Sequence, residues 1–323
     1  MSTGAAALRE AFGPGRVRTG APLAPLTTFK LGGPADVLLE AESVADIRRA
    51  VEIARDFWMP VSVLGGGSNI LVADAGVRGL VIRVRRGAVC AIGEGLVRAD
   101  AGVTINGLVR WTIGRGLASL EAWAGTPGTV GGALYGNAHF HGRNIGDLVA
   151  GASVLAADGR VQELEPGEME FGYDSSRLQR TGEVVLSADF LVTRGNPELL
   201  RETARTSLAY RKRTQPLASP SAGCIFQNPD PARDRVPEGI PWSAGALVDR
   251  AGLKGLQEGG ARVSPTHANF IVNEGTADAQ SVRRLIERCK AVVLERFGVH
   301  LREEIVYLGF EGQPVSRSIA AEG

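Results

Sequence analysis

Residues 61–72, VSVLGGGSNILV, decide the fold, because three consecutive glycines separate two short apolar runs. The first run has the length and composition of a buried strand. The loop that follows it consists of Gly65, Gly66, Gly67, Ser68 and Asn69. Such glycines let backbone N–H groups turn toward an anion, and the two polar side chains add hydrogen bonds. The spacing is neither that of a Rossmann motif nor that of a P-loop, so the loop predicts a pyrophosphate cradle of another type.

Strand and helix patterns alternate around this loop. Residues 37–41, VLLEA, and residues 79–84, GLVIRV, are typical of strands. In the segment 43–57, SVADIRRAVEIARDF, Ser43 is a candidate N-cap and apolar residues recur at helical spacing. Residues 18–85 are therefore expected to form one unit, preceded over residues 1–17 by a helical turn and a loose lead-in.

The composition excludes several classes of protein. The 36 Lys and Arg and 35 Asp and Glu leave a net charge of +1 over 323 residues, which argues against a nucleic-acid partner. The first residues contain no apolar run long enough for a signal peptide or a membrane helix, so a cytoplasmic protein with no membrane partner is expected. The three cysteines form no C-x-x-C pair, and His139 and His141 have no acidic partner at ligand spacing. Neither a disulfide framework nor a metal site is therefore expected.

A second glycine-rich stretch occupies residues 124–138, AGTPGTVGGALYGNA. Its small residues and the hydroxyl of Thr126 suit a wall against a flat ring or further phosphate oxygens. Alone, the stretch fits a sharp structural turn equally well, but the first loop in the same chain favours binding. A helix over residues 104–113, several short strands and a hairpin turn at Asp158-Gly159 predict a second unit over residues 86–198.

Residues 210–216, YRKRTQP, and residues 221–229, SAGCIFQNP, carry the polar chemistry of the C-terminal part. Arg, Lys and Gln side chains together can hold a diphosphate and a carboxylate. Cys224 follows a glycine, which exposes it to a bound molecule, although a free cysteine is more often a small buried apolar residue. Helix and strand patterns over residues 199–298 predict a third, compact α+β unit.

The segment 299–310, VHLREEIVYLGF, is expected to be a strand. Alternation places Leu301, Glu303 and Ile305 on one face and Arg302 and Glu304 on the other. One of the two glutamates then points into the interior or a cleft, unless the segment is an edge strand with solvated charges. Residues 311–323 are expected to be a frayed tail.

Nine motifs, in this order, resemble the UDP-N-acetylenolpyruvoylglucosamine reductase (MurB) family in its shorter, second form. The resemblance extends from about residue 18 to residue 310. The motifs are TTFKLGGPAD, VLGGGSNILV, AGTPGTVGGALYGNA, FGYDSSR, YRKRTQP, SPSAGCIFQNP, GALVDRAGLKG, VSPTHANFIVN and LREEIVYLG.

This resemblance implies an activity and a fold. The activity is the reduction of UDP-N-acetylglucosamine enolpyruvate to UDP-N-acetylmuramate in peptidoglycan precursor synthesis, with hydride from NADPH passing through non-covalent FAD. The fold is α+β, with a two-part FAD-binding domain of the vanillyl-alcohol-oxidase (PCMH) type and a smaller α+β substrate-binding domain. The strand over residues 299–310 is expected to join the first part. A nucleotide-sugar substrate and a monomeric protein are implied as well.

The resemblance also implies roles for individual residues. The FAD pyrophosphate is assigned to Gly65, Gly66, Gly67, Ser68 and Asn69. The flavin is assigned to Thr126, Pro127, Gly128, Gly131 and Gly132, with Asn137 and Ala138 nearby. The sugar nucleotide is assigned to Tyr173, Arg211, Lys212, Gln215 and Asn228, with Lys212 a contact of NADPH as well. Cys224 falls where most members have a serine that protonates the substrate carbon, and Glu304 matches the acidic partner of the substrate carboxylate.

Two positions depart from the family pattern. Cysteine at position 224 keeps a protonated donor, and its ordinary pKa of about 8.5 suits proton transfer near neutrality. The usual Tyr-Arg-x-Ser reads Tyr173-Asp174-Ser175-Ser176, so the catalytic arginine is missing from its place. Arg177, three residues on, is expected to swing into the same pocket and restore the positive charge.

Two alternatives remain at this stage. A flavin oxidase on the same scaffold is compatible with the first 200 residues, but the motifs within residues 205–305 argue against it. A non-catalytic binder of flavin or nucleotide sugar is suggested only by the displaced arginine. The sequence leaves open the preference between NADPH and NADH.

Overall fold

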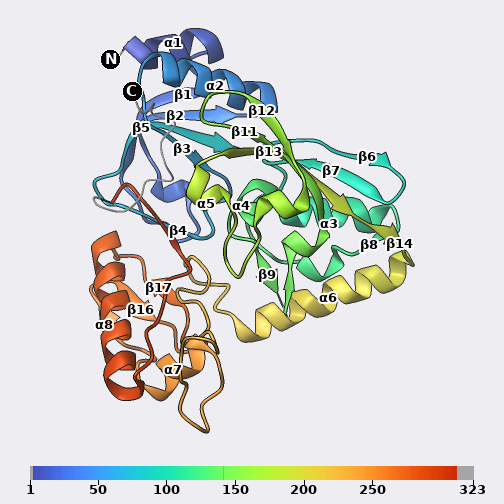
Figure 1. Ribbon diagram of the computed structural model, residues 1–323. Coiled ribbons are helices and arrows are strands. Elements are labelled where there is room, and N and C mark those ends of the chain that lie inside the picture. The colour runs from blue at the N-terminus through green and yellow to red at the C-terminus, as the bar shows by residue number, and fades with distance from the viewer. Residues whose placement is uncertain (1–2, 141, 311–323) are drawn as a thin grey trace.

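The computed structural model describes residues 3–140 and 142–310, which form three units in chain order (Figure 1). The first unit is built on a four-stranded sheet in the order β1-β2-β5-β3. β1 and β2 are antiparallel, whereas β5 is parallel to both β2 and β3. These strands are β1 (Val17–Pro22), β2 (Pro34–Ala41), β5 (Val77–Val84) and β3 (Val61–Leu64).

Helices α1 (Thr3–Phe12) and α2 (Val44–Asp56) complete this unit, with the short 3₁₀ turn η1 (Ala24–Leu26). The predicted N-cap is confirmed, because the Ser43 hydroxyl accepts a hydrogen bond from the Asp46 backbone N–H at 3.1 Å. The helical turn expected among the first residues is a helix of ten residues, α1, in the structure. Ala5 and Leu8 of α1 are buried in the core that α2 also covers, so burial of apolar surface makes this segment a packed helix.

The second unit contains a five-stranded antiparallel sheet in the order β12-β11-β13-β7-β6. Its strands are β12 (Val161–Leu164), β11 (Val149–Leu155), β13 (Val184–Leu191), β7 (Leu96–Asp100) and β6 (Val89–Gly93). Two small ladders flank it, β8 (Leu117–Ala118) with β14 (Thr193–Arg194), and β9 (His139–Phe140) with β10 (Arg143–Asn144). Its helical segments are α3 (Ile105–Gly114), η2 (Glu121–Trp123), α4 (Val130–Tyr135), η3 (Ile145–Leu148), η4 (Pro166–Met169) and α5 (Leu178–Thr181).

Helix α6 (Pro197–Thr214) leads from the second unit to the third. It contacts α3 and η2, and Leu200 is buried in the core of the second unit. Figure 1 shows it running beneath this unit toward the orange C-terminal part. Packing therefore joins α6 to the second unit near its start, and the boundary expected at residue 199 stays a prediction.

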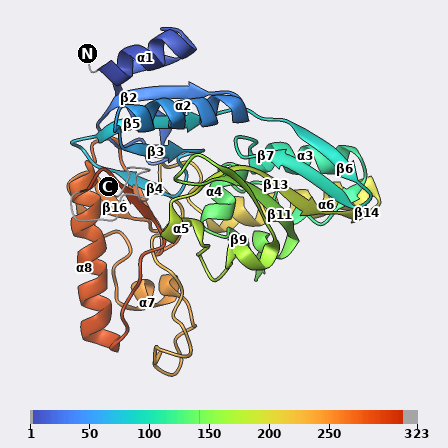
Figure 2. The same cartoon turned by 45° about the horizontal axis from the view of Figure 1, so that its top comes forward.

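The third unit packs α7 (Ala244–Arg250) and α8 (Ala279–Phe297) with a three-stranded antiparallel sheet in the order β15-β16-β17. The strands are β15 (Gln257–Glu258), β16 (Ala261–Val263) and β17 (Ile271–Asn273). Its core also takes in Phe29 and Leu71 from the first unit. Figure 2 shows α7 and α8 standing to one side of the two larger sheets.

The chain finally returns to the first unit, where β18 (Val306–Leu308) pairs in parallel with β4 (Ile70–Val72). The strand is shorter than the predicted 299–310, because the preceding backbone bonds to a different partner. The N–H of Gln227 donates to the Arg302 carbonyl oxygen, and the N–H of Glu304 donates to the Ile225 carbonyl oxygen, each at 2.8 Å. The predicted tail, residues 311–323, lies outside the described residues. Among the described helices, none has the length and apolar character needed to cross a membrane.

Candidate active site

The two glycine-rich loops pack directly against each other. A Cβ atom on Gly66 would lie 2.7 Å from the Cα of Gly128, closer than real Cβ contacts allow. Gly128 itself has a φ of +103°, which side chains other than hydrogen rarely permit. Gly66 is therefore required by the close approach of two backbones and Gly128 by its own backbone conformation, which the sequence patterns did not reveal.

The first loop keeps free hydrogen-bond donors. Within residues 3–140 and 142–310, the backbone N–H groups of Gly66, Gly67 and Ser68 donate to no other residue. Three consecutive free N–H groups on one turn suit an anion such as a pyrophosphate. The residues present therefore fit the phosphate part of a dinucleotide.

The second loop is held from α3 and continues into α4. Asn106 clamps it, since its side-chain amide donates to the Thr126 carbonyl oxygen at 3.1 Å and its Oδ1 accepts from the Gly125 N–H at 2.7 Å. Thr129 caps α4, and the Gly131 N–H donates to the Ala101 carbonyl oxygen at 3.0 Å. This short helix thus fixes the stretch that contains Pro127, Gly128, Gly131 and Gly132.

Asn137 and Ala138 stand at the end of α4. The buried Asn137 side chain donates to the Gly172 carbonyl oxygen at 2.7 Å and accepts from the Gly146 N–H at 2.9 Å. Asn137 therefore ties β9 to the loop that carries Tyr173, and these bonds occupy its amide within the protein. The Ala138 N–H bonds to the Ala133 carbonyl oxygen at 2.8 Å, which closes the turn before β9.

Cys224 lies in a rigid loop of the third unit. Gly223 before it has a φ of +82°, and Asn269 fixes the residues after it. The Asn269 side chain accepts from the Phe226 N–H at 2.9 Å and donates to the Phe226 carbonyl oxygen at 2.8 Å. Burial, with Glu304 and Asp174 nearby, raises the pKa of the Cys224 thiol well above its usual range, and Arg211 opposes that rise. The Cys224 thiol is thus a weaker acid than a cysteine with the ordinary pKa of about 8.5.

Three titratable side chains from three parts of the chain meet beside Cys224. Ligand-type atoms of His139, Asp174 and Glu304 all lie within 4.8 Å of one another. His139 Nδ1 is 2.8 Å from Asp174 Oδ1, and the His139 ring centroid is 5.1 Å from that of Tyr173. Burial, together with the charge of Asp174, raises the pKa of Glu304 well above its usual range. We refer to His139, Asp174 and Glu304 as the acid cluster.

Within the acid cluster, His139 and Asp174 form a hydrogen-bonded pair. The 2.8 Å contact between His139 and Asp174 is a hydrogen-bond distance. A buried guanidinium, that of Arg211, is also close enough to oppose further positive charge on His139.

Arg211 is a buried cation on α6. Its Nη2 donates to the Thr126 hydroxyl at 2.8 Å, and its guanidinium carbon lies 3.8 Å from the centroid of the Phe140 ring. Removal from water lowers its pKa to about 10, and its Nε lacks a partner among the described residues. Since a buried charge without a counterion is costly, this side chain is suited to an anionic ligand.

Arg177 does not join this group. It forms a bidentate pair with Glu183, with Nη2–Oε1 at 2.9 Å and Nε–Oε2 at 3.0 Å, and its Nη1 also donates to the Glu168 carbonyl oxygen. These contacts hold the guanidinium at the N-terminal end of α5. The structure therefore contradicts the expectation that Arg177 swings into the place of the missing arginine, because Glu183 already neutralises it.

The other predicted substrate residues are Tyr173, Asn228, Lys212 and Gln215. The Asn228 N–H donates to the Tyr173 hydroxyl at 3.3 Å, and the Asn228 side chain accepts from the Ala244 N–H at the start of α7. Lys212 is exposed and Gln215 half-buried at the end of α6. Within the described chain, neither of these two side chains forms a hydrogen bond or ion pair.

Sequence reasoning missed Asn106, Asn269 and the position of His139 beside Asp174 and Glu304. It treated His139 only as one half of a pair with His141, because its partners lie 35 and 165 residues away in the chain. The available signal was Asp174 itself, an acidic residue at a position where the resemblance predicts a cation.

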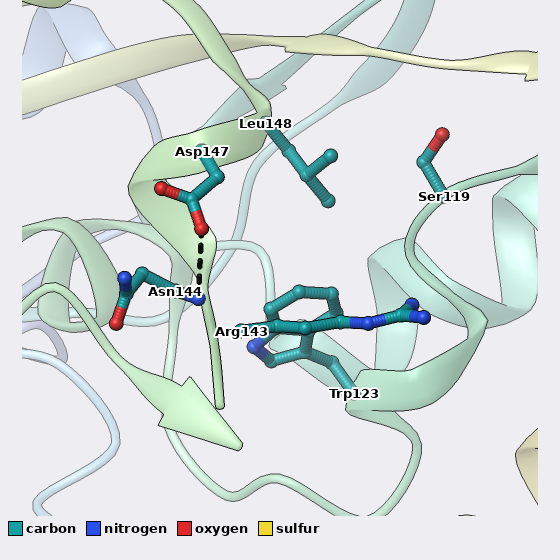
Figure 3. A pocket seen from close by; sticks show the side chains of 6 residues that line it. All are labelled: Ser119, Trp123, Arg143, Asn144, Asp147 and Leu148. Atoms are coloured by element: carbon teal, nitrogen blue, oxygen red, sulfur yellow. Dashed lines mark hydrogen bonds between the residues drawn. The ribbon is translucent and has the colours of Figure 1, made fainter. Parts of the chain in front are cut away.

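A separate cavity of about 280 Å³ lies in the second unit (Figure 3). It is lined by Ser119, Trp123, Arg143, Asn144, Asp147 and Leu148. The Asn144 N–H donates to Asp147 across one wall at 3.1 Å. This cavity contains none of the residues that the sequence assigned to the site.

Comparisons with known proteins agree with this geometry. Residues 35–165 match the model of an FAD binding domain, and residues 215–308 match that of the UDP-N-acetylenolpyruvoylglucosamine reductase C-terminal domain. UDP-N-acetylenolpyruvoylglucosamine reductase 1 of Bacillus anthracis is 39% identical over 306 residues, covering 91% of this chain and 95% of that protein. The chain belongs to the UDP-N-acetylenolpyruvoylglucosamine reductase (MurB) family.

Other MurB proteins support the same assignment. UDP-N-acetylenolpyruvoylglucosamine reductase 2 of Symbiobacterium thermophilum is 40% identical, covering 92% of this chain and 93% of its own length. The crystal structure of MurB from Thermus caldophilus superposes with a TM-score of 0.74 at 34% identity, covering 90% of this chain and 98% of that one.

These findings confirm the predicted family, its shorter form, the FAD-binding fold and the additional C-terminal domain. The chain is an FAD-containing oxidoreductase with MurB reductase activity in peptidoglycan precursor synthesis, and its substrate is a nucleotide sugar. The match of residues 215–308 to a MurB domain removes the basis for the oxidase alternative.

Proposed function

We propose that the protein reduces UDP-N-acetylglucosamine enolpyruvate to UDP-N-acetylmuramate, with NADPH as the hydride source and Cys224 as the proton donor. The observation that carries this proposal is the connection between the glycine loop and the acid cluster. Asn69, at the end of the loop, donates from its side-chain amide to the Glu304 carbonyl oxygen at 3.2 Å, and the Glu304 N–H donates to the Ile225 carbonyl oxygen at 2.8 Å. The cofactor loop, Glu304 and the Cys224 loop are thus held together.

The two glycine loops would hold FAD. The free N–H groups of Gly66, Gly67 and Ser68 suit its pyrophosphate, and the loop from Thr126 to Gly132 suits the flavin side. When bound, FAD accepts hydride from NADPH and supplies it to the substrate.

The substrate would be held by Tyr173, Arg211, Lys212, Gln215 and Asn228. Arg211 is already desolvated and lacks a carboxylate partner in the described chain, so a phosphate or a carboxylate would satisfy it. Lys212 and Gln215 lie on the same helix end, close in sequence to Arg211 and free to reorient toward a sugar diphosphate.

Cys224 would protonate the substrate carbon next to the carbon that accepts hydride. Hydride addition to the terminal carbon leaves an enolate whose charge extends onto the carboxylate. The Cys224 thiol has its pKa raised by burial, so it holds its proton near neutrality until this strongly basic carbon forms. Arg211 lies close enough to favour the thiolate that remains.

The experiment that tests this proposal is an anaerobic stopped-flow comparison of wild type, Cys224→Ser and Cys224→Ala. NADPH should bleach the flavin in all three proteins, and the enolpyruvyl substrate should restore the colour in wild type and Cys224→Ser. Cys224→Ala should lose this second step by about 10²- to 10⁴-fold, the usual contribution of a positioned proton donor. Equal loss of both steps in Cys224→Ala would contradict the assignment.

Two further parts of the proposal concern the oligomeric state of the protein and its location in the cell. We expect a monomer in the cytoplasm, where the nucleotide-linked substrate and NADPH are both available. Sedimentation analysis of the FAD-loaded protein, showing one species that contains a single 34.0 kDa polypeptide, would support the first point.

A further inference from the structure

The proposed site presents a charge problem. Asp174 and Glu304 place two carboxyl groups where a substrate carboxylate must also bind, and Asp174 stands at the position where the resemblance predicts an arginine. Like charges at such distances in a desolvated site oppose each other strongly. A cation or bound protons must therefore compensate.

His139 is placed to supply that charge. Its Nδ1 donates to Asp174 Oδ1 at 2.8 Å, which directs the other nitrogen, Nε2, away from Asp174. The strand β9 carries His139 beside the Tyr173 ring, and Tyr173 in turn contacts the Asn228 backbone. The imidazole therefore lies among the residues that we assign to the substrate.

Asp174 is held in a conformation that points to function. Its φ is +52°, a left-handed value that is uncommon outside glycine, and its residue is only 9% exposed. One carboxylate oxygen bonds to His139, while Oδ2 is buried without a partner among the described residues. Backbone strain and a buried, unsatisfied carboxylate oxygen at one residue persist when a functional site requires them.

We propose that the His139 imidazolium, oriented by Asp174, binds the substrate carboxylate through Nε2 and stabilises the enolate that hydride addition produces. This inference rests on the proposed reductase function and deepens it. His139 takes the place of the missing family arginine as a catalytic residue, and Asp174 is a positioning residue that fixes the ring and balances its charge.

The electrostatic surroundings favour a protonated His139. The hydrogen bond to Asp174 and the charge of Glu304 raise its pKa, while burial and the nearby Arg211 oppose that rise. The charged and titratable groups that face the cluster are Asp174, Glu304, Arg211, Tyr173 and Cys224. A raised pKa means that His139 is charged below that pKa and loses its charge as pH rises through it.

Among the described residues, neither Arg177 nor Arg211 bonds to the acid cluster. Arg177 is neutralised by Glu183. Arg211 is engaged with Thr126 and the Phe140 ring, on the side of the flavin loop. His139 is the group that lies within hydrogen-bond distance of Asp174 and at the same time near Glu304.

The first test measures the proton on His139 directly. NMR titration of the four histidines in the FAD-loaded protein, with the His139 signal identified by its loss in His139→Gln, should give a pKa above the ordinary value of about 6.5. Asp174→Asn should lower that pKa. A His139 pKa at or below the ordinary value in wild type, or no change in Asp174→Asn, would overturn the inference.

The second test separates this inference from the proposed function. In anaerobic stopped-flow measurements, His139→Gln should keep flavin reduction by NADPH and slow reoxidation by substrate about 10²- to 10³-fold, the usual effect of removing one oxyanion donor. His300→Gln, at an exposed position in the segment before Leu301, is the matched control and should behave as wild type. The inference fails if His139→Gln matches wild type between about pH 6 and about pH 9. The proposed function fails separately if substrate does not reoxidise the wild-type flavin at all.

Discussion

The side-chain amide of Asn69 donates a hydrogen bond to the backbone carbonyl oxygen of Glu304 at 3.2 Å, across 235 positions of sequence. The Val306 N–H reciprocates with a bond to the Asn69 carbonyl oxygen at 2.9 Å. These bonds fix the distance between the loop that would hold FAD and the carboxyl group of the acid cluster. In the proposed function, Asn69 therefore couples cofactor binding to the position of Glu304 in the substrate site.

Asn69→Ala should weaken both functions at once. Loss of the amide leaves the Glu304 carbonyl oxygen without this partner and costs about 1 kcal/mol of stability. We expect weaker retention of FAD and slower reoxidation by substrate, measured by flavin release on dilution and by stopped flow. Ser68→Ala is the comparison variant, because its hydroxyl is assigned to the FAD pyrophosphate but does not bond to the Glu304 segment, so it should weaken FAD retention without slowing reoxidation by substrate. An Asn69→Ala protein that loses only FAD affinity would show that the connection is unimportant.

Gly66→Ala should disrupt the packing of the two glycine loops. The new methyl group would meet the Gly128 backbone, which cannot move as a side-chain end can. Overpacking of this kind costs about 1–3 kcal/mol. We expect a lower Tm in apoprotein and a loss of bound flavin, whereas Gly93→Ala, whose Cβ would meet open space, should change neither. Normal Tm with loss of flavin alone would assign Gly66 to the ligand rather than to packing.

Glu304→Gln should stabilise the protein at alkaline pH while impairing catalysis. The raised pKa of Glu304 means that the folded protein holds a proton which the unfolded chain releases. The contribution of Glu304 to the free energy of unfolding is complete below the pKa that Glu304 has in the unfolded chain. It falls as the pH rises toward the higher pKa that Glu304 has in the folded protein. Removing the carboxyl should therefore raise Tm more near pH 9 than near pH 5, as followed by thermal unfolding.

Glu303→Gln is the matched control for that experiment. Glu303 pairs with Lys290 at 2.9 Å on the other side of the chain, so its loss should lower Tm slightly or leave it unchanged. A Glu304→Gln protein whose gain in Tm is the same at acidic and alkaline pH would contradict the burial of an ionisable Glu304.

Arg177→Gln should affect stability rather than catalysis. It leaves Glu183, whose side chain is 7% exposed, without its bidentate partner, and breaking a buried pair in this way costs about 3–5 kcal/mol.

Arg211→Gln should instead raise KM for the substrate, because it removes the desolvated cation of the proposed site. Steady-state kinetics and thermal unfolding of both variants distinguish the two arginines. A kcat loss in Arg177→Gln with unchanged Tm would restore Arg177 to the site.

Local patterns predicted most of the secondary structure. The N-cap Ser43, the helix that Thr104 caps and the turn at Gly159 all depend on neighbours within a few residues. The predicted ends of helices and strands were less accurate where a hydrogen-bond partner distant in the chain fixes the end. Residues 301–305 alternate like a strand, yet their backbone bonds go to the Cys224 loop, which no local pattern encodes.

The sequence by itself determined the glycine loops, the cysteine at position 224, the acidic residue at position 304 and the absence of arginine at position 174, because residue type and spacing are local. Only the tertiary structure decided which side chains compensate for that absence. Arg177 is near in sequence but neutralised by Glu183, whereas His139, Asp174 and Glu304 meet from three separate segments. The physical reason is that charge balance in a desolvated site depends on distance in space, and folding sets that distance independently of distance along the chain.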